Sequence, residues 1–229
     1  MRYKWLFFDL DGTIWDFPTN SEIVLKLLLK QLTPHLVEQE QEFLDLYHKY
    51  NDILWVEYGH GNITKEVLRR KRFADALSHF AVTDDNIITH FSEQYITMAP
   101  YQTHLMPNAI EVLDYLKQKG YRLYLLTNGF AEIQHIKITK SGLTGYFEKV
   151  FTSDEMGYKK PHKLAFDYAV KYVNARKRES LMIGDEWPTD IEGAQRAGID
   201  QVYYHTKNKP PQGQSTFVIT NLLELKQIL

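Results

Sequence analysis

Five short apolar runs along the chain predict the strands of one sheet. Each run is followed at once by polar residues, and the runs occupy residues 3–9, 121–127, 150–153, 180–184 and 201–204. A continuous apolar run, without alternation, is typical of a strand that is covered on both faces. The pattern therefore predicts a buried parallel sheet with polar side chains at the strands' carboxyl ends.

Helical patterns separate these runs. Apolar residues at Ala109, Val112, Leu113 and Leu116 follow the i, i+3, i+4, i+7 spacing of a helix, which Gly120 is expected to end. The stretch 166–173 repeats that spacing. Strands that alternate with helices indicate a doubly wound α/β fold, in which ligands bind at the carboxyl ends of the strands.

Residues 20–97 depart from this alternation and are predicted to form four helices. The first covers 23–32, the second includes 43–50, the third starts after Thr64 as its N-cap, and the fourth covers about 87–96. The first strand is thus separated from the rest of the sheet by an inserted helical module. Near the other end, a polar loop at 207–215 precedes a last short strand and helix.

Composition limits the classes of function. The chain has 229 residues, 44% of them apolar, a formal charge of -2 and no cysteine. The near-neutral charge favours neither a nucleic-acid polymer nor a membrane as partner, and the missing thiols exclude disulfides, thiolate metal sites and a cysteine nucleophile. With no long apolar segment and no signal peptide, the expected location is the cytoplasm.

The first apolar run ends in two carboxylates, Asp9 and Asp11, followed by Gly12 and Thr13. Two aspartates at a strand end suit a hard divalent cation with oxygen ligands, and Mg²⁺ fits best. A metal offsets one carboxylate and leaves the other available for proton transfer. Taken alone, the same residues also fit a turn with helix-capping aspartates.

Three further segments place polar groups after predicted strands. Thr127-Asn128-Gly129 offers a hydroxyl, an amide and a permissive backbone that suit phosphate oxygens, although a plain strand-to-helix turn has the same composition. Lys160-Pro161 is predicted to open the helix of 166–173, with a solvated lysine as the alternative. Gly184-Asp185 ends the fourth run, and Asp190 follows five residues later.

In this order, the segments resemble the four motifs of the haloacid dehalogenase-like (HAD) phosphohydrolase superfamily. The resemblance implies an α/β fold with a Rossmann-like, three-layer core around a parallel sheet, plus an inserted all-helical cap. The core is expected to comprise residues 1–17 and 98–229, and the cap residues 18–97. The sheet and insertion patterns extend the resemblance over nearly the whole chain.

The resemblance also implies a mechanism. Asp9 acts as the nucleophile that forms an aspartyl-phosphate, and Asp11 as the general acid and then base. Mg²⁺ is bound by Asp9, the Asp11 backbone carbonyl and Asp185. The phosphoryl oxygens are bound by Thr127, Asn128 and Lys160, while Asp190 supports Lys160 or the metal.

A narrower resemblance concerns the substrate. Residues 54–58 and 61–64, with Gly129, Phe130 and Gln134, look like the noncanonical pyrimidine 5'-nucleotidases of this superfamily. This implies hydrolysis of nucleoside 5'-monophosphates, with Gly129 and Trp55 among the substrate-binding residues. Trp55 could stack on a base, but aromatic residues at helical spacing are more often core residues.

Other reactions stay open within the family. Asp11 argues against a dehalogenase, because those enzymes lack this second carboxylate and use no metal. A phosphomutase, or a phosphatase for a small metabolite such as a sugar phosphate or phosphoglycolate, shares all four motifs. A non-catalytic phosphate-binding protein is a further alternative, but it has no need of the nucleophile and the acid together.

Overall fold

The apolar runs form a six-stranded parallel sheet in the computed structural model, which describes residues 2–206 and 213–229. Its spatial order is β3-β2-β1-β4-β5-β6, and every pair of neighbours is parallel. The strands are β1 (Trp5–Phe8), β2 (Arg122–Thr127), β3 (Lys149–Thr152), β4 (Ser180–Gly184), β5 (Asp200–Tyr204) and β6 (Phe217–Ile219). All five predicted strands and the last short one are confirmed. The predicted loop at 207–215 lies largely outside the described residues.

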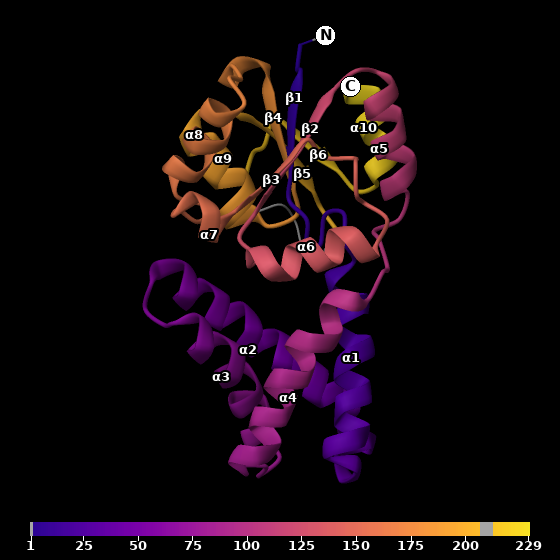
Figure 1. Ribbon diagram of the computed structural model, residues 1–229, viewed down its shortest axis with the longest axis vertical. Coiled ribbons are helices and arrows are strands. Elements are labelled where there is room, and N and C mark those ends of the chain that lie inside the picture. Colours follow the sequence, from indigo (N-terminus) through magenta and orange to yellow (C-terminus); the bar gives the residue numbers. More distant parts are fainter. Residues whose placement is uncertain (1, 207–212) are drawn as a thin grey trace. The chain divides into compact units, whose positions relative to one another are not determined.

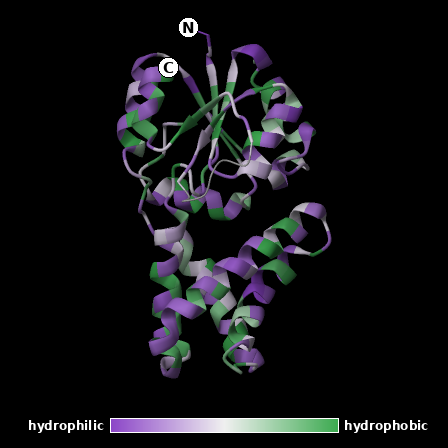
Figure 2. Ribbon diagram, turned by 180° about the vertical axis from the view of Figure 1, so that it is seen from behind, coloured by the Kyte–Doolittle hydropathy of each residue, from purple (hydrophilic) through white to green (hydrophobic). Residues whose placement is uncertain are grey.

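Successive residues of β1 point to opposite faces of the sheet, and each face is covered by helices (Figure 1). Leu6 and Phe8 belong to a core that includes α5, whereas Trp5 and Phe7 belong to a second core with α8 and α9. The helices of this part are α5 (Ala109–Gln118), α6 (Ala131–Lys140), α7 (Ser153–Met156), α8 (Lys163–Tyr172), α9 (Glu192–Ala197) and α10 (Leu225–Ile228). The arrangement is the predicted three-layer, Rossmann-like fold, with apolar strands between more polar helices (Figure 2).

The strand order reverses at β1, and this fixes where a ligand site is expected. From β1 the chain continues to β2 and β3 on one side of the sheet, and then to β4, β5 and β6 on the other. β1 therefore pairs with both β2 and β4. In open parallel sheets, ligands bind outside the carboxyl ends of the strands at such a switch point. Asp9 follows β1 at this point.

The chain divides into two compact units. The α/β unit comprises Met1–Phe17 and Thr103–Leu229, and the helical unit comprises Pro18–Gln102. The predicted insertion ended at residue 97, before the short 3-10 helix Ala99–Tyr101 with which the helical unit closes. Whether the helical unit acts as a cap stays a prediction.

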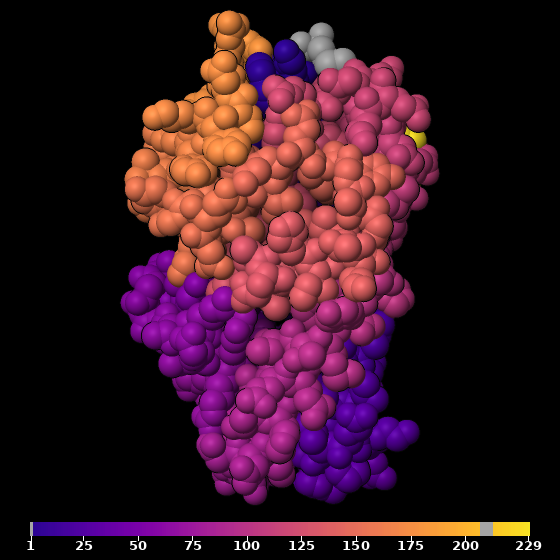
Figure 3. Space-filling model, in the orientation of Figure 1, coloured from indigo at the N-terminus to yellow at the C-terminus, as the bar shows by residue number. Residues whose placement is uncertain are grey.

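The helical unit contains the four predicted helices: α1 (Phe17–Leu32), α2 (Glu40–His60), α3 (Lys65–Ser78) and α4 (Asp85–Met98). Thr64 caps α3 as predicted, since its hydroxyl accepts a hydrogen bond from the Val67 backbone N–H. The apolar faces of the four helices share one core. In the space-filling view, side chains cover the gaps that the ribbon diagram leaves between these helices (Figure 3). Among the described residues, no helix combines the length and apolar character needed to cross a bilayer.

A cation lies inside this helical core. The Arg72 guanidinium is buried and lies 4.8 Å from the ring centre of Tyr95 and 5.3 Å from that of Phe73. One guanidinium nitrogen donates a hydrogen bond to Asn51 Oδ1 at 3.1 Å. Aromatic faces attract cations, so the three aromatic and amide partners offset part of the cost of burying the charge.

Candidate active site

A tight turn after β1 presents the first two carboxylates. The Trp15 N–H donates to the Leu10 carbonyl at 2.8 Å, and the Gly12 N–H donates to the Trp15 carbonyl at 2.8 Å. Gly12 has φ +82°, and a Cβ at this position would lie 2.4 Å from Asp185 Oδ2. Only glycine allows both this backbone conformation and so close an approach of Asp185.

Three buried carboxylates meet at this end of the sheet. Asp9, Asp185 and Asp190 each offer an oxygen within 4.8 Å of the others, although Asp9 follows β1, Asp185 follows β4 and Asp190 lies in the π-helical turn Trp187–Ile191. They are 7%, 8% and 0% exposed, respectively. The Lys160 ammonium lies 2.6 Å from Asp9 Oδ1 and 2.6 Å from Asp190 Oδ1. The cluster thus has three carboxylates but one ammonium, which pairs with two of them, and this acidic excess fits a divalent cation with oxygen ligands.

The carboxylates differ in what they can still bind. Asp190 uses both oxygens, because Oδ1 accepts from Lys160 and Oδ2 accepts from the Glu186 backbone N–H at 3.1 Å. Asp185 Oδ1 accepts from the Thr13 hydroxyl at 2.9 Å. Among the described residues, nothing donates to Asp9 Oδ2 or Asp185 Oδ2. These two oxygens are the ones available to a metal or a substrate, which fits Asp9 and Asp185 as ligands and Asp190 as a supporting residue.

Burial and mutual repulsion perturb these groups. Burial raises the pKa of Asp9 to about 7, with Lys160 opposing the shift and Asp190 and Asp11 adding to it. Burial, and then the charges of Asp9, Asp190 and Glu186, raise the pKa of Asp185 well above its ordinary range. Burial lowers the pKa of Lys160, but Asp190 and Asp9 outweigh it and hold the pKa above its usual value. Such a cluster of shifted groups is typical of a functional site.

The residues after β2 complete this edge. Thr127 is buried, and its Oγ1 accepts hydrogen bonds from the Gly129 backbone N–H at 3.1 Å and from Gln134 Nε2 at 2.9 Å. Asn128 holds the backbone of Lys160, because its Nδ2 donates to the Lys160 carbonyl and its Oδ1 accepts from the Lys160 N–H, both at 2.8 Å. Asn128 therefore positions Lys160, a role that the sequence did not predict. Its predicted contact with a substrate stays a prediction.

Lys160 differs from its predicted position in one respect. Helix α8 begins at Lys163, and the His162 side chain caps it by accepting from the Leu164 N–H, so Lys160-Pro161 does not open the helix. The prediction that Lys160-Pro161 opens this helix was therefore wrong. Lys160 instead lies in the preceding loop, with its ammonium between Asp9 and Asp190.

Two residues of α6 join the site without having been predicted as catalytic. Lys137 Nζ lies 2.6 Å from Asp11 Oδ1, and Gln134 Nε2 donates to Asp11 Oδ2 at 2.8 Å. The sequence signal for them is weak: both are polar residues on the buried face of a helix, spaced by three, beside the apolar Ile138. Only the position of α6 relative to Asp11 identifies them.

Trp55 belongs to the helical unit. It lies in α2, is partly exposed, and its ring packs edge-on against Tyr58 at a centroid distance of 5.7 Å. It is not among the buried hydrophobic residues, whereas Leu54 beside it is buried. Its predicted role in substrate binding stays a prediction.

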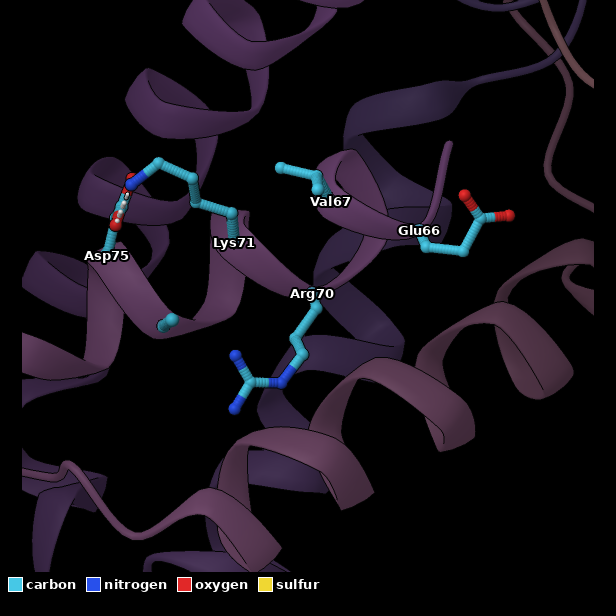
Figure 4. Close-up of a pocket in the computed structure, with 6 residues that line it drawn as sticks. Glu66, Val67, Arg70, Lys71 and Asp75 are labelled. Carbon is cyan, nitrogen blue, oxygen red and sulfur yellow. Dashed lines mark hydrogen bonds and ion pairs between the residues drawn. The ribbon is translucent and has the colours of Figure 1, made fainter. Parts of the chain in front are cut away.

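A hollow in the helical unit lies along α3 (Figure 4). It is lined by Glu66, Val67, Arg70, Lys71, Ala74 and Asp75. Lys71 pairs with Asp75 at 2.8 Å and Arg70 pairs with Asp85, so three of the four charged lining side chains have an ion-pair partner within the unit. The hollow offers a solvated, charge-balanced helix face and no reactive group.

The fold is Rossmann-like, with an acidic cluster at the carboxyl ends of its strands. The sequence model of haloacid dehalogenase-like hydrolases matches residues 3–198, and the chain belongs to that family. The protein is therefore an enzyme, a hydrolase of the HAD family, as its motifs indicated.

Individual relatives cover the whole chain. Pyrimidine 5'-nucleotidase PynA of Streptococcus pneumoniae is 33% identical over 100% of this chain and 96% of its own length. A glyceraldehyde 3-phosphate phosphatase of Methanothermobacter thermautotrophicus is 26% identical over 99% of both chains. The crystal structure of HAD-hydrolase YfnB of Bacillus subtilis, bound to magnesium, matches with a TM-score of 0.88 and 28% identity, covering 100% of this chain and 99% of that one.

Proposed function

We propose that this hydrolase cleaves phosphomonoesters through an aspartyl-phosphate and acts on pyrimidine nucleoside 5'-monophosphates. The observation that carries the proposal is the placement of Asp9. Its Oδ1 is held by the Lys160 ammonium at 2.6 Å, and its Oδ2 accepts no hydrogen bond from the described residues. A buried carboxylate with one oxygen fixed and the other open suits a nucleophile at a topological switch point.

The reaction has two displacements. Asp9 Oδ2 attacks phosphorus while the bond from phosphorus to the ester oxygen breaks, and Asp11 donates its proton to the leaving oxygen. Asp11 then takes a proton from water, which attacks the aspartyl-phosphate and releases phosphate with Asp9 regenerated. Lys160 and the Thr127 hydroxyl bind the transferring phosphoryl oxygens. They thereby orient the phosphoryl group and offset its negative charge before the reaction begins.

Mg²⁺ is the proposed cofactor. Its ligands would be Asp9, the Asp11 backbone carbonyl and Asp185. Asp190 would not bind the metal but would hold Lys160 in place. When bound, it offsets the negative charge gathered between the nucleophile and the phosphate. The excess of carboxylates over ammonium groups and the open oxygens of Asp9 and Asp185 support this assignment, and the relative YfnB is known bound to magnesium.

The pyrimidine nucleotide is proposed because PynA matches this chain over its full length and at 33% identity. A sugar-phosphate substrate is the second candidate, favoured by the full-length match to a glyceraldehyde 3-phosphate phosphatase at 26% identity. The α/β unit contacts only the phosphate in the proposed mechanism. The choice between the two candidates therefore concerns residues that bind the leaving group.

A substrate panel tests the proposal. Phosphate release is measured from nucleoside 5'-monophosphates, sugar phosphates, glyceraldehyde 3-phosphate and phosphoglycolate, each with Mg²⁺ and with EDTA. We expect metal-dependent release, fastest from deoxyuridine and thymidine monophosphates. A preference for a small ester would reassign the substrate and keep the mechanism, and transfer of phosphate to a second hydroxyl of the substrate would identify a mutase. No release from any ester would overturn the proposed activity.

Trp55→Ala tests whether the helical unit takes part in base recognition. If a pyrimidine stacks on this ring, removing it costs about 1–3 kcal/mol of binding. We expect KM for the best nucleotide to rise by about tenfold or more while KM for p-nitrophenyl phosphate stays unchanged. Tyr172→Ala, at an exposed aromatic residue of α8, is the matched control. Equal changes for both substrates would assign Trp55 to packing.

A further inference from the structure

Helix α6 turns two polar side chains inward. Gln134 is 0% exposed and Lys137 6% exposed, although both residue types are usually found at the surface. They are three residues apart and therefore lie on the same helix face. A buried ammonium is costly unless it is paired, so its partner indicates why it is there.

The partner of both side chains is Asp11. Lys137 Nζ lies 2.6 Å from Oδ1, and Gln134 Nε2 donates to Oδ2 at 2.8 Å, so each oxygen of this carboxylate has its own donor. Two donors on two oxygens fix both the rotation and the direction of a carboxylate, as a single contact does not. The Lys137 ammonium also lies 4.2 Å from the ring centre of Trp15, in the turn that carries Asp11.

Gln134 also determines which way the Thr127 hydroxyl points. Thr127 Oγ1 accepts from Gln134 Nε2 and from the Gly129 N–H, which uses both acceptor positions of a hydroxyl. Its own proton is left to donate to a third group, and a phosphoryl oxygen is such an acceptor. The Gln134 amide thus fixes one oxygen of Asp11 through one lone pair, which leaves the carboxyl group able to carry a proton, and it leaves the Thr127 hydroxyl as a donor.

The backbone beside Gln134 is shaped for this contact. A Cβ at Gly129 would lie 1.9 Å from Gln134 Nε2, so any larger residue at this position would displace the amide. The Gln134 Oε1 atom is buried and has no hydrogen-bond partner among the described residues. A buried amide that leaves one acceptor unused, yet donates to two site residues, is placed for those two contacts.

We infer that Lys137 and Gln134 are positioning residues that hold Asp11, and through Gln134 also Thr127, in the geometry needed for phosphoryl transfer. The inference rests on the proposed function, in which Asp11 serves both displacements. Nothing in it requires either residue to touch the substrate or the metal. Position alone is sufficient, because a misplacement of about 1 Å in an active site can cost about 10²-fold in rate.

The effect of a misplaced Asp11 on the rate should depend on the leaving group of the substrate. An alkyl phosphate releases an alkoxide that needs the proton of Asp11, whereas p-nitrophenyl phosphate releases a stable anion that leaves without one. Hydrolysis of the aspartyl-phosphate needs Asp11 as the base in either case. A misplaced Asp11 should therefore slow both steps for an alkyl ester but only the second step for the nitrophenyl ester.

Lys137→Met and Gln134→Met are the test variants, since methionine keeps most of the volume and removes the donor. Rapid-mixing measurements follow the first turnover with p-nitrophenyl phosphate and with the alkyl phosphate that the wild type hydrolyses best. We expect the alkyl first turnover to slow by about 10–100-fold. The nitrophenyl first turnover should stay within a few-fold of wild type and become a burst before a slow steady state. Lys137→Arg should restore part of the loss.

Lys140→Met is the matched control, because it makes the same change at an exposed position of the same helix. Equal slowing of both first turnovers, or variants indistinguishable from Lys140→Met, would overturn the inference. If Lys137→Met does not fold, as judged by its thermal melt, the Gln134→Met result decides. A wild type inactive on all esters overturns the proposed function and this inference together, whereas an active wild type with unaffected variants overturns only the inference.

Discussion

Asp9→Asn is expected to lower kcat by at least about 10³-fold, as loss of a nucleophile does in other enzymes that form covalent intermediates. The amide oxygen is a poor nucleophile toward phosphorus, so no aspartyl-phosphate forms. The fold should persist, because asparagine has the same shape and its oxygen can still accept from Lys160. Burial already raises the pKa of Asp9 to about 7, so a neutral side chain is well tolerated here.

Two measurements check this result. Phosphate release gives kcat, and mass spectrometry after an acid quench detects the phosphorylated wild type and its absence in the variant. Asp52→Asn, at an exposed position of α2, is the control for the substitution itself. Appreciable turnover by Asp9→Asn, together with a wild-type melting temperature, would show that another group attacks the phosphate.

The sequence predicted the site well where the chemistry follows strands. Asp9, Thr127 and Asp185 each end or follow a buried apolar run, and parallel strands bring their carboxyl ends to one edge. The order of the strands was not readable from the runs, yet any doubly wound order places these three residues at the same edge. Local pattern and sheet geometry therefore agree at this part of the molecule.

The rest of the site depends on tertiary contacts that no local pattern contains. Helix α6 shows little apolar periodicity, because Gln134 and Lys137 occupy part of its buried face. A lysine and a glutamine at helical spacing normally indicate a solvated face. The role of Asn128 was also ambiguous in the sequence, because its amide suits a phosphate as well as a backbone segment. In the structure it binds the Lys160 backbone. In each case the partner lies more than 30 residues away.

Asp185→Asn is expected to remove metal-dependent activity and, at the same time, to stabilise the metal-free protein. A metal at the phosphoryl group contributes several kcal/mol, so kcat should fall by about 10²-fold or more. The gain in stability has a separate cause. Asp185 is buried beside Asp9 and Asp190, whereas a neutral amide removes the repulsion and can still accept from the Thr13 hydroxyl.

The gain should depend on pH in a defined direction. Burial first, and then the charges of Asp9 and Asp190, raise the pKa of folded Asp185 above its ordinary value of 3.8. The folded state therefore holds this proton more tightly than the unfolded state. The stability that this proton contributes is fully present below the pKa of Asp185 in the unfolded state. It is lost as pH rises through the pKa of Asp185 in the folded state. In EDTA, the melting temperature of Asp185→Asn relative to wild type should thus increase as pH rises.

In Mg²⁺, the wild type should instead be more stable than Asp185→Asn. A ligand that binds only the folded state stabilises it, so Mg²⁺ should raise the wild-type melting temperature and leave Asp185→Asn nearly unchanged. Thermal melts from about pH 5 to about pH 8, in EDTA and in Mg²⁺, measure both effects, with Asp52→Asn as the control. An equal Mg²⁺ response in both proteins would exclude Asp185 as a ligand. A variant less stable than wild type in EDTA at the upper pH would show that the buried carboxylate is not repelled. Because the two effects have opposite signs, a general loss of structure cannot produce both.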